Sequence, residues 1–253
     1  MTVYVFGDSF CARTTRGSWV YHLKQHYDVT HFGKPGTGPY YSFDIFYELL
    51  LNNEFKDGDK IVFGISTAQR TEFTERYAFE NGNKEYGNID FFKKIHTDVL
   101  FRNFKDICFL HQLAKNTSNI DFFVFRTLAD LEGEFFSMND KEVEEVFDFD
   151  VKYLDIIPKY KSFLNFDTEN FYYLPESLLS ISVREIRNCQ GVDSTYHIID
   201  KWRHNHLSEE NNLIFFNKIK NFFERVDETL DFEKDIYYNE LKKNDRFRDF
   251  IYE

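Results

Sequence analysis

Strand-like and helix-like stretches alternate along this chain, and this alternation restricts the fold more than any other feature of the sequence. The runs Val3–Phe6, Lys60–Ile65 and Ile120–Phe125 are short and rich in β-branched and aromatic residues, and Asp28–Phe32 is short and extended. Continuous apolar runs of this length are typical of strands that are buried on both faces of a parallel sheet.

The stretches between these runs have helical spacing. Apolar residues recur every three to four positions in Ser18–Tyr27, Tyr40–Asn52 and Phe91–Lys115, and Ser208–Arg225 has the same pattern after a capping serine and two acids. Strands that alternate with helices predict a parallel sheet with right-handed crossovers. With a fifth strand at Asn170–Leu174, we expect a three-layer α/β/α fold with five parallel strands in a flavodoxin-like arrangement.

The expected organisation is one α/β domain over residues 1–228 with an inserted, lid-like segment at about 127–190, followed by a helical extension over 229–253. The residues from 66 to about 87 are polar, and no element is predicted there. The extension is charged but contains Leu230, Phe232, Ile236, Leu241, Phe247 and Phe250. These apolar residues need a covered surface, and a second subunit or a protein partner is one alternative.

Charge and cysteine content exclude several classes of protein. The 253 residues include 31 basic and 43 acidic ones, a net charge of −12, which argues against nucleic-acid binding. Cys11, Cys108 and Cys189 are odd in number and form no CxxC pair, so neither a disulfide framework nor a zinc knuckle is expected. We find no signal-peptide pattern and no run of ~20 apolar residues, so we expect a cytoplasmic protein without a membrane span.

Polar loops follow the predicted strands at their carboxyl ends. Gly7-Asp8-Ser9 follows the first strand, the glycine-rich stretch Gly33–Gly38 the second, and Gly64–Thr67 the third, while His204–Ser208 precedes the last helix. Ligands of open parallel sheets bind at the carboxyl ends of the strands. We therefore expect these four loops to meet at one edge of the sheet.

These motifs, in this order, resemble the SGNH (GDSL-type) hydrolase family over most of the chain apart from the insertion and the extension. The resemblance implies that Ser9 of the Gly-Asp-Ser motif is the nucleophile. It implies that the backbone N–H groups of Ser9 and Gly36, together with the Ser66 side chain, bind the oxyanion. The ending HLSEENNLI is similar to the last motif of the family and makes His206 the general base. The implied activity, which needs no cofactor, is hydrolysis of a carboxylic ester, such as an O-acetyl or acyl group on a carbohydrate.

Two positions depart from the family pattern. Arg203 stands where the family has an aspartate, so Asp200 or a backbone carbonyl would orient His206 instead. Ser66 stands where the family usually has an asparagine. Some relatives, phage-encoded ones among them, are similar to this chain, because they have a hydroxyl residue at that place and an arginine just beyond it. The arginine here is Arg70. The departures leave open an alternative, a non-catalytic binding or structural protein of viral or capsule-related origin. A phage-encoded chain could be virion-associated.

The residue types agree with the implied chemistry. A serine hydroxyl needs an imidazole within roughly 2.6–3.2 Å to take its proton, and fixed donors must meet the charge on the carbonyl oxygen. Asp8, Arg70 and His204 are further site candidates. A third alternative is a metal ion shared by His204 and His206, although no HExxH motif or dense carboxylate cluster accompanies them.

Overall fold

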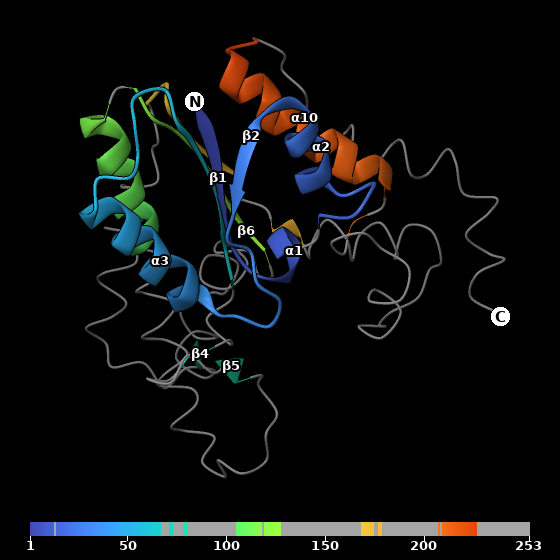
Figure 1. Cartoon of the computed structure of the whole chain (residues 1–253), viewed down its shortest axis with the longest axis horizontal. Coiled ribbons are helices and arrows are strands. Elements are labelled where there is room, and N and C mark those ends of the chain that lie inside the picture. Colours follow the sequence, from blue (N-terminus) through green and yellow to red (C-terminus); the bar gives the residue numbers. More distant parts are fainter. Residues whose placement is uncertain are drawn as a thin grey trace, which may run out of the picture.

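A parallel five-stranded sheet with the order β2-β1-β3-β6-β7 forms the centre of the molecule (Figure 1). The computed structural model describes residues 1–12, 14–66, 71–72, 78–79, 105–117, 119–127, 168–174, 177–178, 207 and 209–226. The strands of the sheet are β1 (Thr2–Phe6), β2 (Asp28–His31), β3 (Lys60–Ile65), β6 (Asp121–Arg126) and β7 (Phe171–Leu174). Because all four pairings are parallel, the five strands end at one edge, here called the carboxyl edge.

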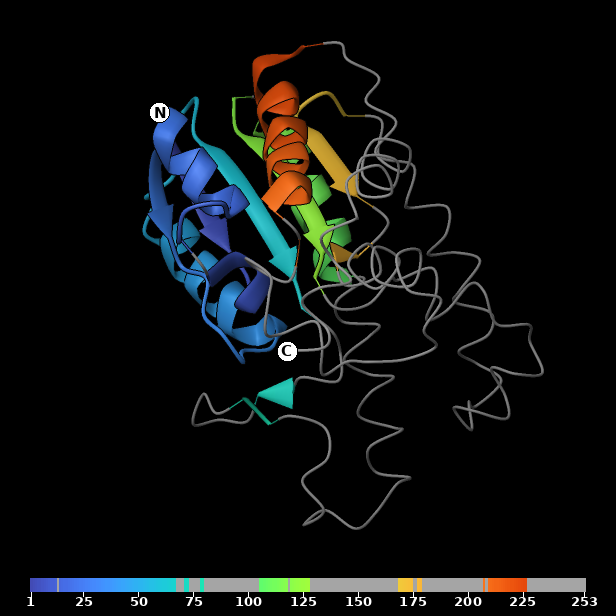
Figure 2. The ribbon, with the colours of Figure 1, turned by 90° about the vertical axis from the view of Figure 1, so that its right-hand side faces the viewer.

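Helices cover both faces of this sheet, so the predicted three-layer α/β/α architecture is confirmed. The helices α2 (Trp19–His26) and α10 (Glu209–Glu224) lie side by side on one face (Figures 1 and 2). The other face is covered by α3 (Pro39–Leu51) and by a helix over residues 105–116. The short helix α1 (Ser9–Ala12) follows β1 directly.

The two central strands supply both halves of the core. Every residue of β3 and β6 is buried. Phe123 and Phe125 pack into the cluster under α2 and α10, whereas Phe122 and Val124 pack into the cluster under α3. Burial of each such phenylalanine contributes roughly 1.5–3 kcal/mol. Because successive side chains of a strand point to opposite faces of the sheet, each of these strands packs against the helices on both sides.

Residues that favour the start of a helix stand at the beginning of α2, α3 and α10. Ser18 caps α2, because its hydroxyl accepts a hydrogen bond from the Tyr21 N–H at 3.1 Å. Pro39 opens α3 in its first turn, where a missing N–H costs nothing. Glu209 and Glu210 occupy the first turn of α10, where negative charge is favourable.

The short helix α1 was not predicted, and neither was a two-stranded hairpin. Thr71–Glu72 (β4) and Ala78–Phe79 (β5) pair antiparallel within the stretch that the sequence indicated as polar and without structure. Strands of two residues are too short to show an alternating pattern, so the sequence carries no signal for them. The expected strand at Ile120 begins one residue later, at Asp121.

Several predicted segments lie outside the described residues. They are residues 91–104 of the long helix, most of the inserted segment and the extension over 229–253. The fifth strand, which the sequence indicated within the insertion, is β7 of the central sheet. Within the described part of the chain, no helix is both long and apolar enough to span a bilayer.

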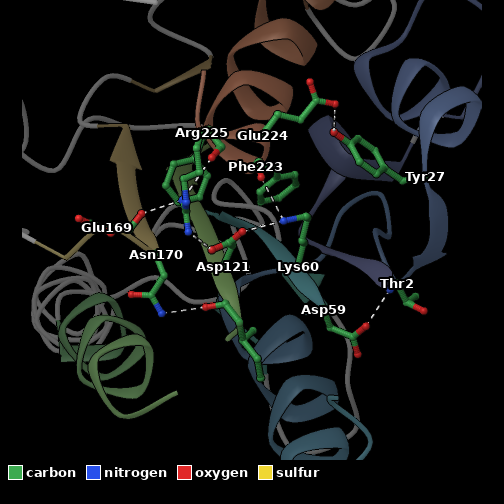
Figure 3. A network of polar contacts seen from close by, with 12 residues as sticks. Thr2, Tyr27, Asp59, Lys60, Asp121, Glu169, Asn170, Phe223, Glu224 and Arg225 are labelled. Carbon is green, nitrogen blue, oxygen red and sulfur yellow. Dashed lines mark hydrogen bonds and ion pairs between the residues drawn. The ribbon is translucent and has the colours of Figure 1, made fainter. Parts of the chain in front are cut away.

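A network of ion pairs at the opposite, amino edge fastens the end of α10 to the sheet (Figure 3). Lys60 and Asp121 are register partners at the starts of β3 and β6, and their side chains form an ion pair of 2.7 Å. Arg225, just after α10, pairs with the other oxygen of Asp121 at 2.5 Å. Lys60 also donates to the Phe223 carbonyl of α10 at 3.3 Å. One carboxylate thus joins two strands to one helix.

Candidate active site

Three loops at the carboxyl edge are joined by one buried carboxylate. Asp8 follows β1, Ser66 follows β3 and Thr127 follows β6. The Ser66 hydroxyl donates to Asp8 Oδ2 at 2.8 Å, and the Thr127 hydroxyl donates to the same oxygen at 2.6 Å. The exposed fractions are 1% for Asp8, 2% for Ser66 and 0% for Thr127. The central three strands are therefore tied together at the edge where the sequence predicts the site.

Asp8 also caps the helix that begins with Ser9. The Phe10 N–H donates to Asp8 Oδ1 at 3.0 Å, which is the usual bond of an aspartate just before the first turn of a helix. The Cys11 N–H donates to the Asp8 carbonyl at 3.0 Å. Ser9 is half-buried and is the first residue of α1. Its position at the carboxyl edge therefore depends on the hydrogen bonds of its neighbour Asp8.

Glycines let α1 lie against the strand ends. A Cβ atom on Gly64 would lie 2.5 Å from Cys11 Sγ, and one on Gly33 would lie 2.5 Å from the Cys11 carbonyl oxygen. A Cβ on Gly7 would also collide with Cys11 Sγ, and Gly7 has a φ of +145°. Burial raises the pKa of the Cys11 thiol well above its ordinary value. Cys11 is thus a small, uncharged residue through which α1 packs against the ends of the strands.

His31, at the end of β2, holds the other end of α1. Its Nε2–H donates to the Cys11 carbonyl at 2.5 Å. Burial lowers the pKa of His31, so its neutral form is favoured. His31 was not among the predicted site residues, because a single histidine at the end of a polar strand has no distinguishing pattern.

The glycine-rich loop after β2 is attached to the same turn. The Lys34 N–H donates to the Gly7 carbonyl at 3.0 Å, and the Thr37 hydroxyl donates to the Lys34 carbonyl at 2.7 Å. Gly36 has a φ of +76°, which favours glycine, and nothing lies within 4 Å of the position of a Cβ atom there. The loop of the predicted oxyanion donor Gly36 thus adjoins the turn that carries Ser9.

The loop before α10 is anchored at Leu207, the residue next to His206 in the sequence. Leu207 is fully buried and belongs to the same apolar cluster as Phe10 and Cys11. The Asn212 side chain donates to the Leu207 carbonyl at 3.1 Å and accepts from the Trp19 N–H at 3.0 Å. This buried amide fixes residue 207 relative to the starts of α2 and α10.

Four predicted site residues lie outside the described residues: Arg70, Asp200, His204 and His206. Asp8, Gly36 and Ser66 lie on loops at the carboxyl edge, and Ser9 is the first residue of α1 at the same edge. The roles of all eight stay predictions. Among the residues that the structure describes, no three histidine, cysteine or carboxylate side chains gather as metal ligands would.

Thr127 was not among the predicted site residues, because it falls at the start of the predicted insertion. The available signal was its place directly after the apolar run IDFFVF and Arg126, where a parallel strand reaches the carboxyl edge. Its partner Asp8 is 119 positions away in the sequence, so no local pattern could link the two.

No family model matches the sequence, and no curated protein matches it significantly. Among solved structures, the chain is similar to a proposed lipolytic protein of the G-D-S-L family from Desulfitobacterium hafniense DCB-2. The identity is 13% and the TM-score 0.36, and the alignment covers 88% of this chain and 98% of that one. A similarity of this size does not identify the chemistry of a site, which must come from its residues.

Proposed function

We propose that this protein is a serine hydrolase that cleaves a carboxylic ester, such as an acetyl or acyl group on a carbohydrate. The observation that supports the proposal is the turn at Ser9. Ser9 begins a short helix directly after an inner strand, at the carboxyl edge, and a buried carboxylate caps the turn. A strand-to-helix turn of this kind is a common way to present a nucleophilic hydroxyl above a sheet.

In the proposed reaction, Ser9 Oγ attacks the ester carbonyl carbon while His206 takes the hydroxyl proton. The tetrahedral intermediate then collapses, the bond to the alcohol breaks, and His206 returns the proton to the leaving oxygen. Water attacks the acyl-enzyme in the second half, again with His206 as base. Its proton passes through His206 to Ser9 Oγ, and the carboxylic acid leaves.

Two backbone N–H groups, those of Ser9 and Gly36, are the proposed oxyanion donors. The loop of Gly36 is bonded to the turn of Ser9 through the Lys34 N–H and the Gly7 carbonyl. The Ser66 hydroxyl donates to Asp8 at 2.8 Å, so its part in oxyanion binding would require it to leave that partner. Loss of one donor typically lowers the rate by ~10²–10³.

His206 is the proposed base because the residue that follows it, Leu207, is buried and bonded to Asn212. Histidine is also the side chain best suited to proton transfer near neutral pH. Asp200 or a backbone carbonyl would orient the ring, since Arg203 cannot.

The test is labelling with a fluorophosphonate probe and turnover of p-nitrophenyl acetate. We expect one label per chain, mapped to Ser9, and no label in Ser9→Ala. His206→Ala should lose turnover, whereas His26→Ala, at an exposed histidine of α2, should keep it. Circular dichroism of each variant verifies the fold.

A folded wild-type protein that neither takes the probe nor turns over the ester would overturn the proposal. It would favour the alternative, a non-catalytic binding or structural protein of this fold. The observation that favours this alternative is the hydrogen bond of Ser66 to Asp8. It occupies the hydroxyl that stands in place of the asparagine of the SGNH family.

A further inference from the structure

We infer that Thr127 is a positioning residue for Ser9, because its hydroxyl, together with that of Ser66, holds the Asp8 carboxylate that caps the turn of the nucleophile. The inference rests on the proposed function and adds to it a residue for which the sequence indicated no role. Thr127 contacts Asp8 rather than the reacting atoms, so it acts through the turn.

Within the described part of the chain, donors from three elements hold the Asp8 carboxylate. Both hydroxyls reach the same oxygen, Oδ2, and the Phe10 N–H reaches Oδ1. The donors belong to the end of β3, the end of β6 and α1, so the carboxylate cannot turn without losing one of them. At 1% exposure, Asp8 has little access to water that could replace a lost donor.

The helix that carries Ser9 cannot fix its own direction. It has four residues, Ser9–Ala12, too few for a ladder of internal hydrogen bonds. Its orientation is therefore set by contacts with the rest of the molecule, among them the bonds to Asp8 at its start and the packing of Cys11 on the glycines. At its other end, His31 donates to the Cys11 carbonyl and Trp19 Nε1–H donates to the Phe10 carbonyl. A change in the Asp8 carboxylate is transmitted to Ser9 through one peptide unit.

Thr127 is well placed to hold Asp8 still. Its N–H donates to the Ile65 carbonyl at 2.9 Å, which continues the ladder between β3 and β6. Its methyl group would lie 3.0 Å from a Cβ on Gly64, so it covers that glycine. A β-branched side chain has few χ1 rotamers, and this one is fully buried. The hydroxyl lies close to Asp8 Oδ2, and its other acceptor, the Ile65 carbonyl, is farther away at 3.4 Å.

Two substitutions at Thr127 distinguish the effect of its hydroxyl group from the effect of its side-chain volume. Thr127→Val keeps the branched volume and removes the donor, whereas Thr127→Ser keeps the donor and removes the methyl group. Thr117→Val is the matched control, because its hydroxyl donates to the Leu113 carbonyl at 2.7 Å at the end of the helix over 105–116. Ser66→Ala removes the second donor to Asp8 Oδ2 and substitutes if Thr127→Val does not fold. Because Ser66 is also an oxyanion candidate, this variant is assessed by amide exchange in α1 and not by labelling rate.

The experiment measures the fluorophosphonate labelling of Ser9 over probe concentration and pH, well below the melting temperature. We expect Thr127→Val to lower the saturating rate constant by roughly tenfold to a hundredfold, with little change in half-saturation, since a misplaced nucleophile reacts slowly. Thr127→Ser should restore most of the rate, and Thr117→Val should change only the melting temperature. Equal saturating rates in Thr127→Val and wild type would overturn the inference and leave the proposed function intact.

Amide hydrogen exchange gives a readout that does not depend on activity. Thr127→Val should speed exchange of the Phe10 and Cys11 amides by about tenfold, with the amides of β6 unchanged, because those two amides donate to Asp8. If the wild type is not labelled, the proposed function fails, and the exchange rates alone decide whether Thr127 holds the turn. Unchanged exchange in α1 would then overturn the inference too.

Discussion

Asp121→Asn is expected to destabilise the fold by about 3 kcal/mol, because it leaves the buried ammonium group of Lys60 without its carboxylate. The Lys60–Asp121 ion pair is 2.7 Å long, and the two side chains are 11% and 12% exposed. Arg225, which pairs with the other oxygen of Asp121, is 47% exposed and can be hydrated. The cost therefore arises mainly at Lys60.

The magnitude follows from what Lys60 keeps after the change. Removal of one partner of a buried ion pair typically costs ~3–5 kcal/mol. Lys60 still donates to the Phe223 carbonyl at 3.3 Å, and its Nζ lies 4.8 Å from the centroid of the Phe223 ring, so we expect the lower end. Arg225 keeps two carbonyl acceptors, those of Glu169 and Phe222, and adds little.

Urea unfolding followed by circular dichroism measures this loss, and a chain of this size should melt roughly 6–12 °C lower. Lys220→Ala is the control, because it breaks the partly exposed ion pair with Glu224 on α10 and should cost only ~0.3–0.5 kcal/mol. Lys60→Met should cost about 1 kcal/mol, less than Asp121→Asn, since it removes the buried charge and leaves Asp121 paired with Arg225.

The reasoning would be refuted if Asp121→Asn cost no more than Lys220→Ala. It would also be refuted if Lys60→Met proved the more damaging change. Either result would mean that water or a rearranged neighbour solvates the ammonium group of Lys60. The ion pair with Asp121 would then not be what offsets the cost of burying that charge.

The remaining predictions concern packing and pH. Gly64→Ala should lower the free energy of unfolding by ~1–3 kcal/mol, because its Cβ would lie 2.5 Å from Cys11 Sγ. In a double-mutant cycle, adding Cys11→Ala should recover part of this loss, and strictly additive losses would contradict the assigned clash. Burial raises the pKa of Cys108 from 9.0 to about 11 and that of Tyr172 from 10.0 to about 12. Above pH 9 the folded chain thus keeps protons that the unfolded chain releases, so the free energy of unfolding should fall as pH rises. Urea titrations at several pH values should show a shallower fall in Tyr172→Phe. An unaltered slope of unfolding free energy against pH would exclude Tyr172 as a source.

The central sheet could be predicted because its signal is local. Strands buried on both faces, such as β1, β3 and β6, are continuous apolar runs, and helices such as α2 and α3 have apolar residues every three to four positions. The hairpin of β4 and β5 was missed because two residues per strand leave no period to detect.

The sequence alone predicted that the loops of Asp8, Gly36 and Ser66 reach the carboxyl edge, since strand direction and parallel topology follow from the alternation of apolar runs and helices. How these loops contact one another, and that the loop of Thr127 joins them, is visible only in the folded chain. Asp8 meets Ser66 across 58 positions and Thr127 across 119, and both hydroxyls converge on one carboxylate oxygen. Such contacts depend on the register of β1, β3 and β6 and on glycines that admit α1. The physical reason is that hydrogen bonds act over about 3 Å in space, whereas a sequence pattern reports only neighbours along the chain.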